Sequence, residues 1–556
     1  MSEKIKWFLV AILVNGGSAI LILLSFSAQA QIEIWQVPVQ ISDTDGNSGG
    51  PHLVADLQNN VHLIWSDWID LASHPPYLQY SSRGSTGQWS EPEFIRELGW
   101  PIKGYFGDNV GVVLGPDGGL HMVWEHYRYD DGEDSITYIR RNADGTWSKV
   151  EEVPHQKEWP AASQPDIGVS PDGTVHVVYQ DWLGPGTQKT IQHVMRLPSG
   201  AWTSTVQVTQ VEGDYLHPML AVDDEGTAHL IYTKKTDDQN EFFSASKKPV
   251  ENWTGPINMN VSPTSENSVE QLTSGAGGRL HLVWTEWDQS VFPWNCSVMY
   301  SGKVRSGGWS APRSLAHHCA TQVAVGADRF GRAHVVWHYD GQLWYTYQSP
   351  EGAFTNPSIA EDTDPYHQFP VDLSIAVDSQ GGRHVSWNSN HDGNIWATSI
   401  SGALAVTEVI TQGGGTLYAF SGDTQVEFPA WAVSEDTLVS FTPQKGTAPA
   451  GKVVLNAFSL TAERVSDGSP VTDFSEPYEI TIYYSDTEIN NVEENTLGLY
   501  WWNKNAWEIL SPREIDTVNN QLTASLDHMT QFAVLGEGGE TTYYLSLPLV
   551  TRGTSP

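Results

Sequence analysis

The chain has 556 residues, with 66 acidic and 29 basic side chains and a formal net charge of −37 at pH 7. It is too long for one ordinary domain. The acid excess argues against nucleic acid or an anionic membrane as a partner, since both are bound through clusters of Lys and Arg. Aromatic residues make up 11% of the chain, which is typical of many-stranded β folds and of surfaces that stack on flat ligands.

Residues 1–30 have the pattern of a secretory signal peptide. Lys4 and Lys6 precede an apolar run that ends at Phe26, and Ala28-Gln29-Ala30 provides the small-residue cleavage site. An uncleaved membrane anchor is the alternative, because the apolar run is long for a signal core. Either way, we expect a protein that is secreted or held at the cell surface.

A stray strand and a repeated motif follow the signal. Trp35–Ser42 reads as the fourth strand of a sheet whose first three strands are missing. After it, a histidine recurs inside a run of β-branched and aromatic residues, as in Val175-His176-Val177-Val178-Tyr179. Consecutive copies of this histidine are 59, 55, 53, 52, 53 and 50 residues apart. The seven repeat histidines are His62, His121, His176, His229, His281, His334 and His384.

Each repeat divides into four short strands. In the order of the chain these are a first strand such as Pro218–Asp223, the histidine strand, a third strand with Tyr such as Ile136–Ile139, and a fourth strand opened by a turn such as Gly145–Ser148. Four-stranded β units at a near-constant period predict an all-β fold with a seven-bladed β-propeller. We expect the stray N-terminal strand to complete the last blade, because an open ring would leave unpaired strand edges.

The turn after the third strand carries a family resemblance. Asn142-Ala143-Asp144-Gly145-Thr146-Trp147 is a degenerate Asp-box in the expected place. Over residues 31–410 the repeats resemble the sialidase-like (BNR/Asp-box-type) β-propeller superfamily. The resemblance implies the fold but little about activity, because one fold hosts many functions. Sialidases of this superfamily clamp a substrate carboxylate with three arginines. Here Arg279, Arg332 and Arg383 fall by the first turn, opposite the expected binding face, so the triad looks absent.

Only two cysteines occur, Cys296 and Cys319. In an exported protein the expected arrangement is a disulfide between them. Two buried free thiols are the alternative.

A second domain follows the propeller. Residues 411–415 read as a linker, and residues 416–536 alternate as strands do, for example at Glu479–Tyr484. We expect a β-sandwich here. The stretches "FPAWAVSEDTLVSFTP" and "DHMTQFAVL" resemble ZU5-like accessory domains. The tail, residues 537–556, is too short to span a bilayer and is either a sorting or anchoring signal or a last strand.

The ZU5-like resemblance implies one possible reaction. In related domains a His-x-Ser/Thr triplet cleaves its own backbone, with histidine as the base and the hydroxyl as the nucleophile. His528 and Thr530 match this spacing. The alternative is that both are strand residues packed at the edge of the sandwich.

The repeat histidines themselves are expected to be structural. One position cannot be catalytic in seven blades, so we interpret it as a buried histidine bonded to a partner in each blade.

The expected ligand site lies just past the histidine strands. In propellers the loop between the second and third strands shares a face with the loop between blades, and ligands bind there near the axis. Acids beside aromatic residues suit sugar recognition, because rings stack on sugar faces and carboxylates accept hydroxyl hydrogen bonds. The candidate acids are Asp67, Glu125, Asp181 and Glu286; the candidate binding residues are Trp68, His126, Tyr127, Trp182, Trp287 and Tyr339. The inter-blade loops add Tyr105, Asp108, His217, Glu270 and His367. The alternative is that the rings cap the blade core while the acids lie in solvent.

No zinc-ligand spacing, phosphate loop or serine elbow is visible, so we expect no nucleotide cofactor and no metal. The loop Asp130–Asp134 is either a solvated acidic loop or a calcium site. The leading hypothesis is a non-catalytic module that binds a carbohydrate or another cell-surface ligand. The alternative is a glycoside hydrolase with two carboxyl groups about 5–9.5 Å apart. The third hypothesis is a protein-interaction scaffold.

Overall fold

The computed structural model describes most of the chain between residues 35 and 538. The described ranges are 35–43, 47–56, 58–68, 77–84, 87–95, 110–127, 134–155, 162–182, 189–209, 213–235, 240–259, 266–288, 295–305, 307–349, 352–362, 370–379, 381–389, 392–400, 406–419, 424–443, 449, 451–484, 489, 492–503, 506–511 and 513–538. Within them lie seven four-stranded sheets, followed by one six-stranded and one five-stranded sheet. The predicted all-β fold is confirmed. The expected signal peptide falls outside the described residues.

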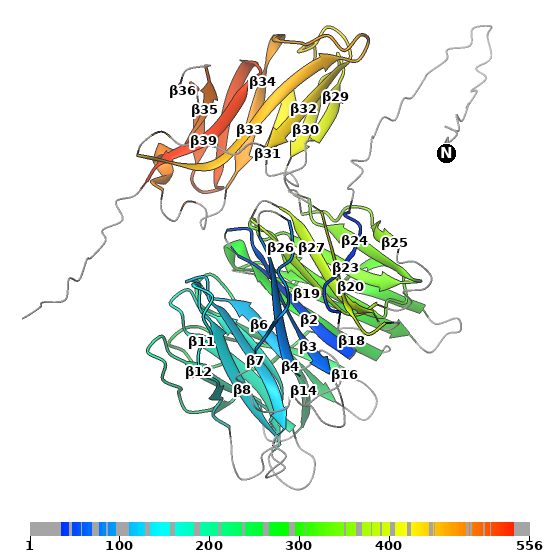
Figure 1. Ribbon diagram of the computed structural model, residues 1–556, viewed down its shortest axis with the longest axis vertical. Coiled ribbons are helices and arrows are strands. Elements are labelled where there is room, and N and C mark those ends of the chain that lie inside the picture. Colours follow the sequence, from blue (N-terminus) through cyan, green and yellow to red (C-terminus); the bar gives the residue numbers. More distant parts are fainter. Residues whose placement is uncertain are drawn as a thin grey trace, which may run out of the picture. The chain divides into compact units, whose positions relative to one another are not determined.

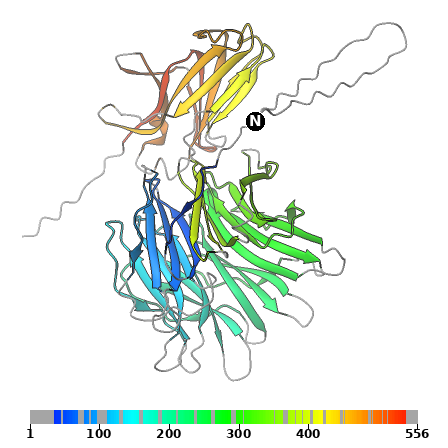
Figure 2. The same ribbon diagram turned by 45° about the vertical axis from the view of Figure 1, so that its right-hand side comes forward.

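The seven four-stranded sheets are the blades of a propeller (Figures 1 and 2). The first strand of each sheet lies against the first strand of the next, and the seventh closes on the first. Blade 1 comprises β2 (Asn47–Ala55), β3 (Val61–Trp68), β4 (Tyr77–Arg83) and β5 (Glu93–Phe94), and blade 2 comprises β6 (Val110–Leu114), β7 (Leu120–Tyr127), β8 (Asp134–Arg141) and β9 (Glu151–Glu152). Blade 3 comprises β10 (Ser163–Val169), β11 (Val175–Trp182), β12 (Lys189–Arg196) and β13 (Val206–Gln207), and blade 4 comprises β14 (Asp214–Val222), β15 (Ala228–Lys235), β16 (Asn240–Lys247) and β17 (Ile257–Asn258). Blade 5 comprises β18 (Glu266–Gly275), β19 (Arg279–Asp288), β20 (Asn295–Lys303) and β21 (Arg313–Ala316). Blade 6 comprises β22 (Gln322–Ala327), β23 (Ala333–Tyr339), β24 (Gln342–Tyr347) and β25 (Ser358–Asp362). Blade 7 comprises β26 (Pro370–Val377), β27 (Arg383–Ser389), β28 (Ile395–Ile400) and β1 (Val39–Gln40).

The N-terminal strand closes the ring, as predicted. Val39 of β1 pairs with Ala397 of β28, and Gln40 pairs with Trp396, so the first strand of the chain is the outermost strand of the last blade. Closure in this way gives the last blade its fourth strand and pairs the edge of β28 that would otherwise be open.

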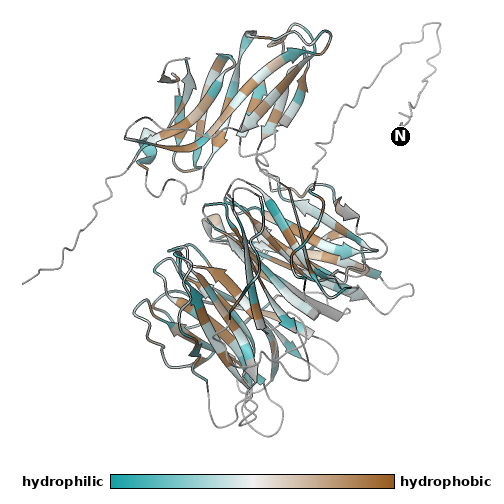
Figure 3. Cartoon of the chain, in the orientation of Figure 1, coloured by the Kyte–Doolittle hydropathy of each residue, from teal (hydrophilic) through white to brown (hydrophobic). Residues whose placement is uncertain are grey.

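Neighbouring blades pack through the two faces of the histidine strand. Successive side chains of a strand point to opposite faces, so the histidine and the residue two positions later share one face. That face packs on the other face of the following blade: Val123 of blade 2 lies in one buried cluster with Val177 and Tyr179 of blade 3. The residues three positions after the histidine are large and buried in every blade, namely Trp65, Trp124, Tyr179, Tyr232, Trp284, Trp337 and Trp387. Figure 3 shows hydrophobic residues, in brown, following the strands.

The repeat histidines are at most 8% exposed, and each has a hydrogen-bonding partner. In blades 1, 2, 5 and 6 the ring Nδ1 lies 2.6–2.8 Å from a tyrosine hydroxyl of the third strand. In blades 1, 4, 6 and 7 the Nε2 lies 2.9–3.4 Å from an aspartate six residues earlier in the chain. The structural role predicted for these histidines is confirmed.

Blades 2, 3 and 5 lack that aspartate. The residue six positions before the histidine is Gly115, Ser170 or Gly275 instead. Burial lowers the pKa of His121, His176 and His281 to about 4, and the acids near them, Asp117, Asp172 and Asp328, offset only part of this shift.

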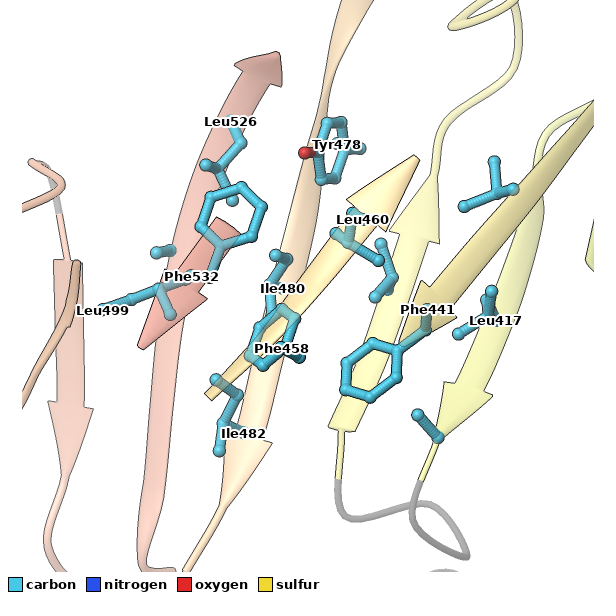
Figure 4. Packing of buried hydrophobic residues seen from close by; sticks show 14 of the residues in the cluster. Leu417, Phe441, Phe458, Leu460, Tyr478, Ile480, Ile482, Leu499, Leu526 and Phe532 are labelled. Carbon is cyan, nitrogen blue, oxygen red and sulfur yellow. The ribbon is translucent and has the colours of Figure 1, made fainter. Parts of the chain in front are cut away.

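The C-terminal sheets form a β-sandwich. The six-stranded sheet has the order β29 (Val406–Ile410), β32 (Thr437–Pro443), β33 (Lys452–Arg464), β39 (Gln531–Glu537), β35 (Gly498–Trp502), β36 (Trp507–Ile509). The five-stranded sheet has the order β30 (Gly415–Ala419), β31 (Thr424–Phe428), β34 (Asp473–Tyr483), β38 (Gln521–His528), β37 (Arg513–Asp516). Side chains of both sheets share one buried core; Figure 4 shows Phe441, Phe458 and Phe532 facing Tyr478 and Ile480.

The expected boundary between the domains differs from the structure. Val406–Ile410 pairs with β32 and so belongs to the sandwich rather than to the propeller. Residues 411–415 are not a linker: Thr411 bridges Gly414, and the segment turns the chain from β29 into β30. The glycine run that suggested a linker is a turn between strands of the same domain.

Candidate functional site

One face of the propeller is defined by strand register. The start of each innermost strand lies beside the end of the histidine strand: Ser48 pairs with Asp67, Ser163 with Gln180, and Asp214 with Lys235. The loops between blades and those between second and third strands therefore emerge together. We call this side the candidate face.

The innermost strands are irregular at this face. Five of the described blades shift register here, between Gly49/His52, Ser163/Asp166, Leu216/Met219, Val269/Gln271 and Val371/Ser374. In four of them one residue adopts a left-handed backbone: Gly50, Gln164, His217 and Asp372, with φ between +50° and +59°. We call these four residues the inner-strand ring. For the three that are not glycine this conformation costs on the order of 1 kcal/mol each, and such strain concentrates at functional sites.

Side chains of the ring bridge neighbouring blades. The amide N–H of Gly50 in blade 1 donates to Oδ2 of Asp372 in blade 7 at 3.3 Å. The N–H of His217 in blade 4 donates to Oε1 of Gln164 in blade 3 at 3.2 Å. Nε2 of Gln164 also lies 3.4 Å from Nδ1 of His217. The ring thus combines carboxylate, amide and imidazole groups, the donors and acceptors that sugar hydroxyls use.

A second layer of ties lies two residues deeper along the same strands. Asp166, Gln271 and Ser374 accept backbone N–H groups of the following blade at 2.7, 2.8 and 2.9 Å. Burial raises the pKa of the Asp166 carboxyl to about 6, although two amide N–H groups favour its charged form.

Glu125 is hydrogen-bonded to one residue of the inner-strand ring. Its carboxylate is 5% exposed and accepts the N–H of Gln164 at 3.3 Å. It stands four residues after its repeat histidine, whereas Asp67 and Asp181 stand five residues after theirs. Glu125 therefore points toward the following blade, and the two aspartates point toward the preceding one. The four candidate acids do not form one layer.

Asp67 is fully buried. It accepts the Ser48 hydroxyl at 3.4 Å and a hydrogen bond from Nε2 of Gln79. Ser48 also donates to Ser42 at 3.0 Å, and the Ser42 hydroxyl accepts the N–H of Ile395 at 2.8 Å. Asp67 therefore joins blade 1 to the N-terminal segment and blade 7, at the closure of the ring.

In blade 3 the candidate acid is buried, whereas the candidate aromatic residue beside it is exposed. Asp181 is fully buried and accepts the N–H of Trp182 at 2.8 Å. Trp182 is 37% exposed, and the Lys189 ammonium lies 5.2 Å from its ring centroid. Asp181 thus positions the strand end, and Trp182 is the group that meets solvent on the candidate face.

The described side chains of blades 5 and 6 form an aromatic cluster. Glu286 and Trp287 lie near the end of β19 and are partly buried, and Trp287 pairs with Cys296. Cys296 and Cys319 are joined by a disulfide with a Cα–Cα distance of 4.7 Å. The preceding His318 stacks on Tyr339 at 4.2 Å between ring centroids.

Loss of this disulfide should destabilise the propeller. It closes a loop with a sequence separation of 23 residues. Loop-closure entropy for that length corresponds to about 3 kcal/mol. Urea unfolding of a Cys296→Ser/Cys319→Ser variant should show this decrease in the free energy of unfolding, and added dithiothreitol should destabilise the wild type equally but leave the variant unchanged. An identical midpoint for the two proteins would contradict the expectation.

The arginines considered for a carboxylate clamp lie elsewhere. Arg332 and Arg383 are 5% exposed, and Arg332 donates to Asp328 at 2.6 Å. Arg196 and Arg305 bind Glu151 and Asp224 at 2.7 and 2.5 Å, at the turns opposite the candidate face. These cations neutralise nearby acids and join blades.

Several predicted residues fall outside what the structure describes. The side chains of Trp68, His126, Tyr127 and Glu270 are among them, as are Tyr105, Asp108, His367 and the loop Asp130–Glu133. Over the described ranges, no group of three or more His, Cys, Asp or Glu is arranged to hold a metal ion. Over the same ranges, no helix is long and apolar enough to cross a membrane.

The His528–Thr530 triplet lies between β38 and β39 of the sandwich. The Thr530 hydroxyl donates to the carbonyl of Trp502 at 3.2 Å rather than to His528. His528 Nδ1 lies 2.9 Å from Asp527, and its ring is in edge contact with Trp501. The two residues are neighbours but are not hydrogen-bonded to one another as base and nucleophile.

Sequence reasoning missed Gln164 and Asp372. A signal for the ring was present nonetheless: Pro51, Pro165 and Pro218 each stand eleven residues before a repeat histidine. Proline inside a strand marks an edge or a bulge, because it cannot donate to the ladder. The residue before each of these prolines is a member of the inner-strand ring.

The fold and site define a seven-bladed β-propeller joined to a β-sandwich. No family model matches the chain, and no curated protein matches its sequence. Among solved structures it is similar to an ulvan lyase of polysaccharide lyase family PL25, at 11% identity and a TM-score of 0.46 over 65% of this chain and 95% of the other. It is also similar to an α-L-arabinanase of Penicillium chrysogenum complexed with arabinobiose, at 11% identity and a TM-score of 0.42 over 66% and 98%. A GH93 α-L-arabinofuranosidase of Fusarium graminearum gives 13% identity and a TM-score of 0.40 over 53% and 92%. Similarity this distant carries no argument about activity.

Proposed function

We propose that the chain is a glycan-binding propeller protein whose site is the candidate face. The inner-strand ring carries this proposal: it keeps three strained, polar, non-glycine residues at one register beside the axis. A fold whose only task was packing would gain nothing from this strain, whereas a site that orients hydroxyl groups would. Partly exposed Trp182, Trp287 and Tyr339 at the surrounding strand ends supply rings that can stack on sugars.

The proposed role is binding without catalysis. Glycoside hydrolysis needs two carboxyl groups facing one sugar. Of the candidate acids, Asp67 and Asp181 are fully buried, Glu125 is 5% exposed, and each accepts hydrogen bonds from its own protein. The hydrogen bonds of these three acids therefore stabilise the protein itself in the absence of a ligand.

Glycan cleavage remains the second candidate for one specific reason. Glu125 accepts the backbone N–H of Gln164 and His217 contacts the Gln164 side chain, so one residue of the inner-strand ring has both a carboxyl and an imidazole partner. Release of new reducing ends from any glycan that the protein binds would favour this alternative over binding alone.

A glycan array with variants tests the proposed function. Trp182→Ala should weaken binding of the array hits about fivefold, because a ring stacked on a ligand contributes on the order of 1 kcal/mol. Trp431→Ala is the matched control, since Trp431 is 66% exposed but lies in the sandwich. If the wild type bound no glycan, the proposal would fail and a protein-interaction scaffold would be favoured.

We also propose that the protein is exported and that its domains are sialidase-like and ZU5-like. The pattern of residues 1–30 and the disulfide Cys296–Cys319 support export, because disulfides persist in oxidising compartments. The turns after the third strand support the first kinship: Gly87, Gly145, Gly200 and Gly352 hold φ between +76° and +89°, and a Trp or Phe stands two residues after each.

We propose that the sandwich does not cleave its own backbone. Since the Thr530 hydroxyl donates to Trp502, no base lies ready to activate it. We therefore expect one intact band on a denaturing gel after prolonged incubation. A fragment beginning at Thr530, identified by mass spectrometry and lost in His528→Ala, would reverse this expectation.

A further inference from the structure

Blade 6 carries several aromatic side chains in contact with one another rather than a single exposed ring. His318 lies 4.2 Å from Tyr339 with the two rings nearly parallel, at 12°. Trp344 meets the edge of His318 at 4.8 Å, and Nε1 of Trp337 donates to Nδ1 of His318 at 3.1 Å. We call His318, Tyr339 and Trp344 the blade-6 platform; all three are partly exposed.

The platform lies on the candidate face. Tyr339 ends β23, and the tight turn Asp340-Gly341 leads directly into β24, where Trp344 pairs with Trp337. His318 precedes β22 in the segment between blades 5 and 6. Both connections emerge on the same side as the inner-strand ring.

Covalent and polar contacts fix His318 from both sides. The next residue, Cys319, is bound to Cys296 of β20. The preceding residue, His317, lies 3.1 Å through Nδ1 from the hydroxyl of Ser297. Burial lowers the pKa of His318, so its ring is neutral near pH 7 and stacks as an uncharged aromatic group. A rigid platform of this kind loses little entropy when a ligand binds.

A second aromatic group lies three blades away. Trp182 of blade 3 is 37% exposed on the same face. In a seven-membered ring these blades are on opposite sides of the axis, with the inner-strand ring between them. Packed sheets are about 10 Å apart, so in a seven-membered ring two blades three steps apart are separated by roughly 20 Å across the axis. One sugar residue cannot reach both.

We propose that the blade-6 platform is a second sugar-stacking site, held by the disulfide, and that the ligand is therefore an extended glycan chain crossing the face rather than a terminal monosaccharide. This inference rests on the proposed glycan-binding function. His318 acts as a positioning residue, and Tyr339 and Trp344 supply stacking surface. Reduction of the disulfide releases the segment that carries His318 and weakens the site.

Chain length separates this inference from the function on which it rests. Disaccharides and decasaccharides prepared from pectin, xylan, alginate and carrageenan are the probes, measured by calorimetry with the full chain. For a bound polysaccharide, the decasaccharide should bind about fivefold more tightly than the disaccharide, since a second stacking contact adds on the order of 1 kcal/mol. Tyr339→Ala and Cys296→Ser/Cys319→Ser should each remove most of this difference between the two lengths.

Controls keep the result interpretable. Tyr418→Ala changes a 43% exposed tyrosine of the sandwich and should leave both affinities as in the wild type. His318→Ala provides a second variant should the cysteine variant unfold. Equal affinity for the two lengths, or length dependence unchanged by Tyr339→Ala, would overturn the inference and leave the proposed function standing. Failure to bind any probe or array glycan would overturn both.

Discussion

The propeller should lose roughly 5 kcal/mol of unfolding free energy between pH 6.5 and pH 4, because buried histidines, His121, His176 and His281 among them, are neutral in the folded chain and bind protons once it unfolds. Burial holds the pKa of His121, His176 and His281 at about 4, against an ordinary value of 6.5. A lowered histidine pKa gives stability that is present above pH 6.5 and is lost as pH falls toward 4. Asp166, with its pKa raised to about 6, acts in the opposite direction and reduces the net loss.

Urea unfolding monitored by tryptophan fluorescence at pH 7.5, 6.5, 5.5 and 4.5 measures this effect. The sandwich contains a single histidine, His528, so its transition should move less and serves as an internal reference. A propeller midpoint that stays constant from pH 6.5 to pH 4.5 would contradict the prediction.

Ser170→Asp tests the cause. Four blades already place an aspartate six residues before the histidine, with Nε2 of His229 at 2.9 Å from Asp223 as the shortest pair. In blade 3 the corresponding Ser170 hydroxyl lies 2.9 Å from His176. A carboxylate there should raise the pKa of His176 and reduce the acid loss by about 1–2 kcal/mol. Ser170→Asn, which is similar in shape but neutral, should not.

Asp67→Ala should lower the free energy of unfolding by about 2 kcal/mol, since it leaves the buried Gln79 amide without its acceptor and removes one of the two acceptors of the Ser48 hydroxyl. The network of Asp67 also includes Ser42, so the loss falls on the closure of the ring. Chemical denaturation of the variant measures it. Asp67→Asn should be milder, because its amide oxygen still accepts one of the two hydrogen bonds.

Asp43→Ala is the matched control. Asp43 is exposed and follows Ser42 directly, so removal of its carboxylate should change stability by less than about 0.5 kcal/mol. If Asp67→Ala unfolded at the wild-type midpoint but lost glycan binding, Asp67 would be a ligand residue after all.

The sequence allowed the blades, their strand order and their closure to be predicted, because each repeat marks its strands with the same residues. It did not reveal how the face is built. Counting acids beside aromatics grouped Glu125 with Asp67, although one residue of difference from the histidine sends them to opposite blades. The domain boundary was placed after Ile410 because Val406–Ile410 fits either domain, and only its pairing with β32 decides.

The inner-strand ring could not be predicted from the sequence for a different reason. Whether Gln164 or Asp372 adopts a left-handed backbone depends on contacts with the neighbouring blade, which alternation of polar and apolar residues does not encode. Proline before Asp166 and before Met219 hinted at irregular strands, but Asp372 precedes Leu373 and gave no such sign.

Closure by β1 has a consequence for the order of events during synthesis. β1 forms a ladder with β28, so Val39 has no partner until Ala397 has left the ribosome. Nearly the whole propeller must be made before its first strand can be used. A chain with so distant a final contact folds late and slowly, which leaves a long interval in which the last blade lacks its outermost strand.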